Sequence, residues 1–165
     1  MPDGPDRDTA GKSGGLSRAC DLLDAPDASR PVQGVPLQEQ KKALRVLIAE
    51  NHRDLSDIMS QLIDTEPDLS CVGQVADAGE VLAAAQRTQA DVLILDLMLH
   101  GGSGLPLIAE LAEALPALKI VVFSGLAFSE DVAREAKRRG AAAFVTKGTD
   151  FSVLLNALRF GGRAA

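Results

Sequence analysis

From Leu44 onward the sequence alternates short β-rich runs with stretches of helical periodicity, and this alternation restricts the fold more than any other feature. Five runs each precede a segment with apolar residues at helical spacing: LRVLIA (44–49), LSCVGQVA (69–76), DVLIL (91–95), KIVVF (119–123) and AAAFV (141–145). Strands that alternate with helices form a parallel sheet covered by helices on both faces. We therefore predict an α/β fold with five strands and five helices.

The segments between the runs carry the marks of amphipathic helices. After the first run, apolar residues are spaced to share one helical face: Leu55, Ile58, Met59, Leu62 and Ile63. Pro106 falls in the first turn of the third predicted helix, where proline is tolerated. Gly140 follows the basic run KRR, as a residue that ends a helix should. DVLIL lacks polar alternation, which predicts a strand buried on both faces.

Residues 1–43 differ in composition from the rest. They hold five of the eight prolines, among glycine, serine and aspartate, which indicates a flexible tail or linker. Within this tail, LSRACDLLDA (16–25) is spaced for a short amphipathic helix, either transient or a docking element. We divide the chain into a tail of residues 1–43, a folded domain of residues 44–160 and a C-terminal tail of residues 161–165.

Charge and cysteine content exclude several classes of protein. A net charge of −6 and a pI near 4.9 argue against direct nucleic-acid binding, which depends on neutralising phosphates. The two cysteines, Cys20 and Cys71, lack metal-ligand spacing, so we expect free thiols. The N-terminus lacks a basic-then-apolar leader, and no apolar run approaches membrane-spanning length. We expect a cytoplasmic protein with no membrane contact.

Polar side chains follow four of the five predicted strands. Glu50 and Asn51 follow the first, Asp96 the third, Ser124 the fourth and Lys147 the fifth. Ligands of open parallel sheets bind beyond the carboxyl ends of the strands, so we expect these residues to meet. Their oxygens can hold a divalent cation, and Asp96 can act as a nucleophile towards phosphorus. Metal and lysine would neutralise phosphoryl oxygens, and the serine hydroxyl would donate to one of them.

Four segments together resemble the receiver domains of bacterial response regulators: VLIAENH, VLILDLMLHGGSG, VVFSG and GAAAFVTKG. The resemblance covers about residues 44 to 160. It implies a flavodoxin-like, doubly wound sheet with strand order 2-1-3-4-5. It also implies that Asp96 is the phosphoacceptor, which takes its phosphoryl group from a sensor histidine kinase or a histidine phosphotransfer protein. Ser124 would be the switch hydroxyl, Lys147 the phosphate-binding lysine, and Phe144 the aromatic residue that turns inward on activation.

The resemblance also implies a magnesium site, and the sequence departs from the family there. The implied ligands are Glu50, Asn51, Asp96 and the backbone carbonyl of Met98. Asn51 stands where a second acid is usual, so we expect Mg²⁺ affinity to be weakened while phosphorylation persists.

Further departures affect the flanking loops. Met98 and Leu126 flank the family's path for the hydrolytic water, and as apolar residues they predict a long-lived phosphoryl group. His100 and Gly148 stand where proline is common. We interpret His52 and His100 as surface or loop residues without a metal-ligand partner.

The expected function is phosphorylation-controlled switching of protein partners in two-component signal transduction, without turnover as an enzyme. Partner preference would change on the surface of the last two helices and the strand between them, which could also form a homodimer. Two alternatives stay open: a truncated transcriptional regulator that lacks its DNA-binding domain, and a receiver that signals without phosphate. A flavodoxin-like electron carrier is disfavoured because the chain has no Tyr or Trp around a flavin. An aspartate-nucleophile phosphatase is disfavoured because Met98 replaces its second acid.

Overall fold

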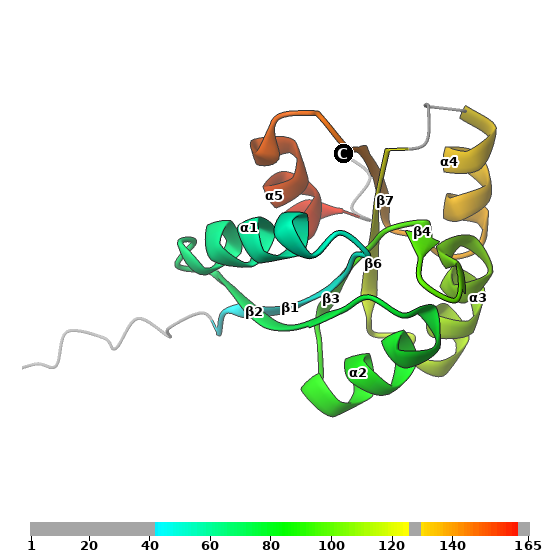
Figure 1. Ribbon diagram of the computed structural model, residues 1–165, viewed down its shortest axis with the longest axis horizontal. Helices are drawn as coiled ribbons and strands as arrows, with labels where there is room; N and C mark the ends of the chain where they lie inside the picture. Colours follow the sequence, from blue (N-terminus) through cyan, green and yellow to red (C-terminus); the bar gives the residue numbers. More distant parts are fainter. Residues whose placement is uncertain (1–41, 126–129, 162–165) are drawn as a thin grey trace, which may run out of the picture. The chain divides into compact units, whose positions relative to one another are not determined.

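The computed structural model describes residues 42–125 and 130–161 (Figure 1). The sequence LSRACDLLDA and Leu126 lie outside the described residues. The elements follow in this order: β1 (Leu44–Ala49), α1 (Arg53–Asp64), β2 (Leu69–Val75), the 3₁₀ turn η1 (Ala78–Glu80), α2 (Val81–Thr88), β3 (Val92–Leu95), β4 (Met98–Leu99), β5 (Gly102–Ser103), α3 (Gly104–Ala114), β6 (Lys119–Ser124), α4 (Glu130–Arg138), β7 (Ala143–Thr146) and α5 (Phe151–Phe160).

Five strands form one parallel sheet in the order β2-β1-β3-β6-β7. Because β6 and β7 are the fourth and fifth strands of this sheet, the predicted order 2-1-3-4-5 is confirmed. The chain leaves β1 towards β2 on one side and later returns to β3 on the other. Carboxyl ends of β1 and β3 therefore lie side by side where the winding reverses, which is the place where such sheets bind ligands.

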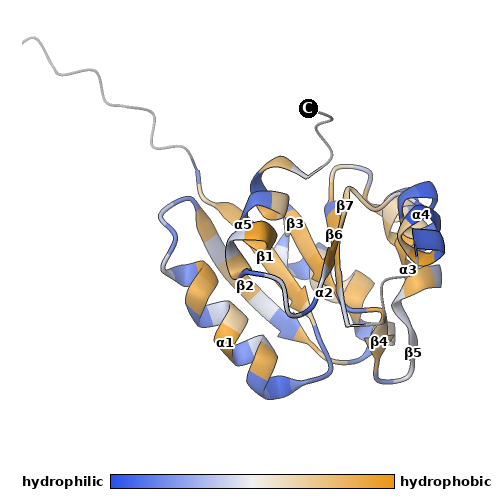
Figure 2. Cartoon of the chain, turned by 90° about the horizontal axis from the view of Figure 1, so that it is seen from above, coloured by the Kyte–Doolittle hydropathy of each residue, from blue (hydrophilic) through white to orange (hydrophobic). Residues whose placement is uncertain are grey.

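The central strands supply two separate cores because their side chains alternate between the two faces of the sheet. Leu93 and Leu95 of β3 pack with α2, α3 and α4, whereas Val92 and Ile94 pack with α1 and α5. All four residues of β3 are buried, which confirms the prediction of a strand covered on both faces. Figure 2 shows mainly hydrophobic residues in the central strands, while α1 alternates hydrophobic with hydrophilic residues and α4 is mainly hydrophilic.

The predicted apolar face of α1 is only partly buried. Met59 and Ile63 enter the core, but the side chains of Ile58 and Leu62 are 55% and 41% exposed. The five apolar positions form a stripe that is wider than the area where one helix contacts a sheet. Only positions one turn apart, such as Met59 and Ile63, face the sheet directly. Ser56 completes the buried side, and its hydroxyl donates a hydrogen bond of 2.7 Å to Gln74 Oε1.

A small hairpin after β3 was not predicted. In the glycine-rich loop, Met98–Leu99 pairs antiparallel with Gly102–Ser103, so β4 and β5 form a second sheet. Gly101 lies in the turn with φ of 77°, a conformation that costs glycine little. The hairpin therefore fixes the path of the chain immediately after Asp96. Within the described residues, no helix is both long and apolar enough to cross a membrane.

Candidate functional site

The carboxyl ends of β1, β3 and β7 bring Glu50, Asp96 and Lys147 together. Their backbones continue the sheet pairing beyond the strands: Glu50 N–H donates to Val75 O at 2.9 Å, Asp96 N–H to Ala49 O at 2.9 Å and Lys147 N–H to Ser124 O at 3.0 Å. The sheet ladder therefore fixes the backbone of all three residues before any side-chain contact is made.

Lys147 lies between two buried carboxylates. Its Nζ atom is 2.5 Å from Glu50 Oε2 and 2.7 Å from Asp96 Oδ2. The side chains of Glu50 and Asp96 are 1% and 3% exposed, and that of Lys147 is 18% exposed. Nζ also lies 5.9 Å from the centroid of the Phe123 ring, within the range of a cation–π contact. Two negative charges thus meet one positive charge in a place with little water.

The second oxygen of each carboxylate faces other donors. Asp96 Oδ1 accepts a hydrogen bond of 3.1 Å from Met98 N–H. Glu50 Oε1 accepts one of 3.0 Å from His52 N–H and lies 3.0 Å from His52 Nδ1. The buried Oδ1 atom of Asn51 accepts no hydrogen bond from the described residues. An acceptor without a donor is costly when buried, so a further electropositive group would satisfy it.

These residues fit a divalent cation. The donors are carboxylate and amide oxygens, which Mg²⁺ prefers in proteins. One of the two negative charges is left uncompensated by Lys147, and a buried unpaired charge is unfavourable. The unpaired Asn51 oxygen and this excess charge both favour a bound cation, which Glu50, Asn51 and Asp96 would hold.

The glycine-rich loop packs tightly beneath Asp96. A Cβ atom on Gly104 would lie 2.4 Å from the carbonyl oxygen of Asp96, so this position admits no side chain without displacing the loop. His100 N–H donates to Ala76 O at 3.0 Å, and His100 O accepts from Ala78 N–H at 2.9 Å. These bonds attach the hairpin to the β2–η1 connection. The histidine at this position allows the first bond, since proline has no N–H to donate.

The remaining predicted residues lie at different depths. Ser124 is fully buried at the end of β6, beside the backbone of Lys147. Phe144 in β7 is half-buried against the core formed with α2, α3 and α4. The side chain of Met98 is 56% exposed.

The interpretation of His52 as a surface residue is confirmed, but its ring is not remote from other possible metal ligands. His52 is exposed, but Glu50, His52 and Asp96 have ligand atoms within 4.8 Å of one another. The contact arises because the chain turns into α1 directly after Glu50, and His52 is the N-cap residue of that helix. A histidine two residues after a strand-end acid was the available signal.

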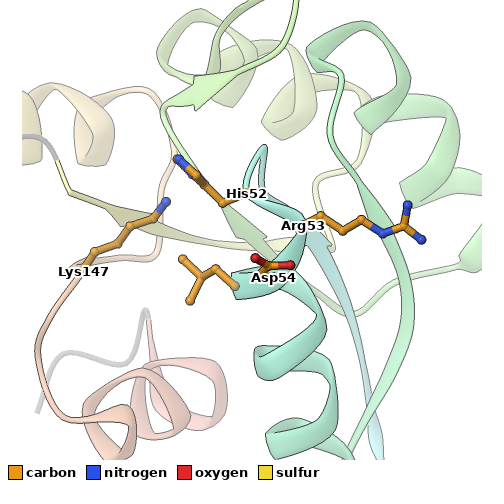
Figure 3. A pocket seen from close by; sticks show the side chains of 5 residues that line it. His52, Arg53, Asp54 and Lys147 are labelled. Carbon is orange, nitrogen blue, oxygen red and sulfur yellow. The ribbon is translucent and has the colours of Figure 1, made fainter.

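Two pockets open beside the acids. One of about 470 Å³ is lined by the start of α1 and by Lys147. Figure 3 shows His52, Arg53 and Asp54 at the start of α1, with Lys147 reaching in from the opposite loop. The second, of about 280 Å³, is lined by residues that include Glu50, Asn51 and Gln74. The site is therefore accessible to ligands although its carboxylates are buried.

The known proteins that this chain resembles include regulatory proteins, and its family match is to a receiver domain. Residues 46–159 match the model of the response regulator receiver domain. The chain is 33% identical over 113 residues to the nitrate/nitrite response regulator protein NarL of Escherichia coli K12, covering 68% of this chain and 52% of that protein. It is 27% identical over 123 residues to the uncharacterized transcriptional regulatory protein YxjL of Bacillus subtilis, covering 74% and 56%. The chain thus spans about half the length of these relatives.

Solved structures share the fold. A LuxR-family two-component response regulator from Aurantimonas sp. SI85-9A1 superposes with a TM-score of 0.67 at 26% identity, covering 72% of this chain and 84% of that one. The response regulator domain of Thermotoga maritima CheB superposes with a TM-score of 0.68 at 22% identity, covering 75% and 99%. The sheet order, the site at the strand ends and the match over residues 46–159 lead to one conclusion. The chain belongs to the response-regulator receiver-domain family.

Proposed function

We propose that residues 44–160 are a receiver domain that accepts a phosphoryl group on Asp96 from a sensor histidine kinase or a histidine phosphotransfer protein, in two-component signalling in the cytoplasm. The observation that carries this proposal is the Asp96 carboxylate, buried at the end of β3 with Oδ2 2.7 Å from Lys147 Nζ. The sheet fixes the nucleophile, and the ammonium lies where phosphoryl oxygens would arrive.

The transfer forms one bond and breaks one. An oxygen of Asp96 attacks the phosphorus of a phosphohistidine, and the P–N bond breaks with its electron pair left on the imidazole. The Lys147 ammonium would stabilise the negative charge on the phosphoryl oxygens, and the Ser124 hydroxyl would donate a hydrogen bond to one of them. A bound Mg²⁺ would supply further charge neutralisation at these oxygens. The pocket of about 470 Å³ opens at Lys147, whose ammonium contacts Asp96, so a donor could approach the site from there.

We further propose that phosphorylation is read out through Ser124 and Phe144. Ser124 is at the end of β6 and Phe144 is in the neighbouring β7, where it pairs with Val122. A phosphoryl group that draws in the Ser124 hydroxyl would leave room for the half-buried Phe144 ring to follow. The phosphoryl group acts only through its different affinity for two existing states. The surface of α4, β7 and α5 would then change its preference for an effector protein.

A homodimer through the same surface remains a prediction. Three ion pairs lie on α4 and the residue that follows it, with Arg134 3.1 Å from Asp131 and with Arg138 and Arg139 each 2.6 Å from Glu135. An interface on this helix would have to share or break these pairs. Exposed pairs of this kind contribute little, so breaking them is not a large obstacle.

A second candidate function is a receiver within a transcriptional regulator. It is favoured by the relatives, since YxjL is described as a transcriptional regulatory protein and the chain spans 56% of its length. The phosphoacceptor chemistry is the same in both cases, and this domain would make no direct nucleic-acid contact. A receiver that signals without phosphate is the competing reading that Asn51 keeps open.

The proposal is tested with a small-molecule phosphodonor and Mg²⁺, followed by intact mass. We expect a mass increase of one phosphoryl group on the natural protein and none on Asp96→Asn. Asp131→Asn is the matched control, because this exposed aspartate of α4 pairs with Arg134 on the surface of the helix and should leave labelling intact. Equal labelling of the Asp96→Asn variant would contradict the assignment of the phosphoacceptor.

A further inference from the structure

We propose that His52 supplies a nitrogen ligand to the cation site, so that the site binds a first-row transition-metal dication such as Zn²⁺ more tightly than Mg²⁺. The ligands would be His52 Nδ1, Glu50 and Asp96. This inference rests on the cation site of the proposed function, but it does not require phosphotransfer. It assigns to the site a class of cation that an all-oxygen ligand set does not favour.

The distances fit a shared metal ion. His52 Nδ1 lies 3.0 Å from Glu50 Oε1. Two ligands bound at the usual Zn–N and Zn–O distances of about 2.0–2.2 Å are about 3.4 Å apart at the tetrahedral angle that zinc prefers, and about 3 Å apart at a right angle. The 3.0 Å contact is a hydrogen-bond distance, and a small separation of the two atoms would bring them to the spacing of neighbouring ligands of one metal ion. The ligand atoms of Asp96, Glu50 and His52 all lie within 4.8 Å of one another.

Lys147 does not compete for all of the oxygens. Its ammonium contacts Glu50 Oε2 and Asp96 Oδ2. Glu50 Oε1 faces His52, and Asp96 Oδ1 faces the backbone of Met98. One oxygen of each carboxylate thus has no contact with the ammonium and accepts a backbone hydrogen bond instead. A cation can bind there while the lysine keeps both of its ion pairs.

The residue types determine which cation gains. Asn51 provides an amide oxygen where a carboxylate would add a negative charge, and Mg²⁺ depends on charged oxygen ligands. Imidazole nitrogen favours zinc, copper, nickel and iron over magnesium. The side chain of His52 is 72% exposed, so its ring is reachable from the pocket and can turn towards a metal ion without unpacking the core.

The whole chain contains two histidines, which makes a direct experiment simple. Imidazole ¹⁵N spectra of the unphosphorylated, untagged protein should contain two ring systems, His52 and His100. We expect Zn²⁺ to shift the ¹⁵N resonance of Nδ1 in one ring only. Mg²⁺ should not produce in either ring the large shift that marks a nitrogen bound to metal. The shift should vanish in His52→Gln and persist in His100→Gln, whose exposed side chain is the matched control. Zn²⁺ bound by a cysteine does not produce this signal.

Affinity gives the second readout. Loss of a partner outside the ligand set already costs about 10- to 100-fold in metal affinity, so loss of a ligand should weaken Zn²⁺ binding at least about tenfold. We expect this loss in both His52→Gln and Asp96→Asn, with Mg²⁺ affinity unchanged in His52→Gln. Equal shifts of both rings, a shift confined to Nε2, or full Zn²⁺ affinity in His52→Gln would each overturn the proposal. Phosphorylation of Asp96 with Mg²⁺ would stand in all three cases, so the two proposals fail separately.

Discussion

The Lys147→Met substitution would remove the ammonium group that separates two buried carboxylates while keeping a side chain of similar length. The nearest ligand atoms of Glu50 and Asp96 are no more than 4.8 Å apart. At an effective dielectric constant of about 20, two like charges at this distance repel by about 3 kcal/mol. Removing one partner from a buried ion pair costs about 3–5 kcal/mol. Since Lys147 is 18% exposed and water can replace it in part, we expect the free energy of unfolding to fall by about 3 kcal/mol, the lower end of that range.

Urea unfolding followed by far-UV circular dichroism is the suitable assay, because the chain has no Trp or Tyr for fluorescence. The double variant Glu50→Gln/Lys147→Met keeps one carboxylate and should be more stable than Lys147→Met. Mg²⁺ should stabilise Lys147→Met more than the natural protein, because the cation would supply the missing positive charge. Arg134→Met, which breaks an exposed pair, should change stability by only about 0–1 kcal/mol. The reasoning fails if Lys147→Met is as stable as the natural protein, or if the double variant is no better than the single one.

Three further predictions concern the loops around the site. Two hydrogen bonds from Ser152 lower the pKa of Asp150 below its ordinary value. The bond from the Ser152 side chain has the larger effect, and the bond from its backbone N–H, at 2.8 Å, has the smaller one. The ionised Asp150 therefore stabilises α5 above the carboxyl pKa of the unfolded chain, and this contribution disappears as the pH falls through the folded pKa. Asp150→Asn, which can still cap the helix, should be less stable at neutral pH and equal in acid, as measured by thermal unfolding across pH. His100→Pro should lose the 3.0 Å hydrogen bond to Ala76 and about 1 kcal/mol of stability in urea, whereas His100→Ala keeps the bond and should lose little. Met98→Asn should shorten the lifetime of the phosphoryl group severalfold, measured as loss of the mass adduct, because a polar side chain can orient the hydrolytic water; an unchanged lifetime would exclude Met98 from this role.

Most of the fold could be predicted because the pattern of apolar residues was unambiguous. VLIL is apolar throughout, as expected for a central strand of a parallel sheet, and all four of its side chains are buried. The meeting of Asp96 and Lys147 was predictable for a related reason. Their strands, β3 and β7, are separated by β6, but both end at the same edge of the sheet, and a lysine side chain is long enough to cross one strand.

The features that could not be predicted depend on the path of the connecting loops and on how the helices are rotated against the sheet. The hairpin of β4 and β5 uses strands of two residues, too short to leave a periodic pattern. The exposure of Ile58 depends on how α1 is rotated against the sheet, which spacing alone does not determine. The contact between His52 and Glu50 depends on the turn that leads from β1 into α1. The rotation of α1 is set by tertiary packing, whereas the hairpin and the turn are local features too short to leave a periodic pattern.

The close packing beneath Asp96 limits how the loop can vary over evolution. Consider a library in which each loop position is varied to all amino acids and functional clones are selected. At position 104 we expect only glycine, because a Cβ atom there would lie 2.4 Å from the carbonyl oxygen of Asp96. Position 101 should be nearly as restricted by its backbone angle. Position 102 should accept alanine, since its nearest neighbour would be a side-chain carbon at 3.7 Å. Two of these three glycines would thus be held by geometry, while the third is free to drift.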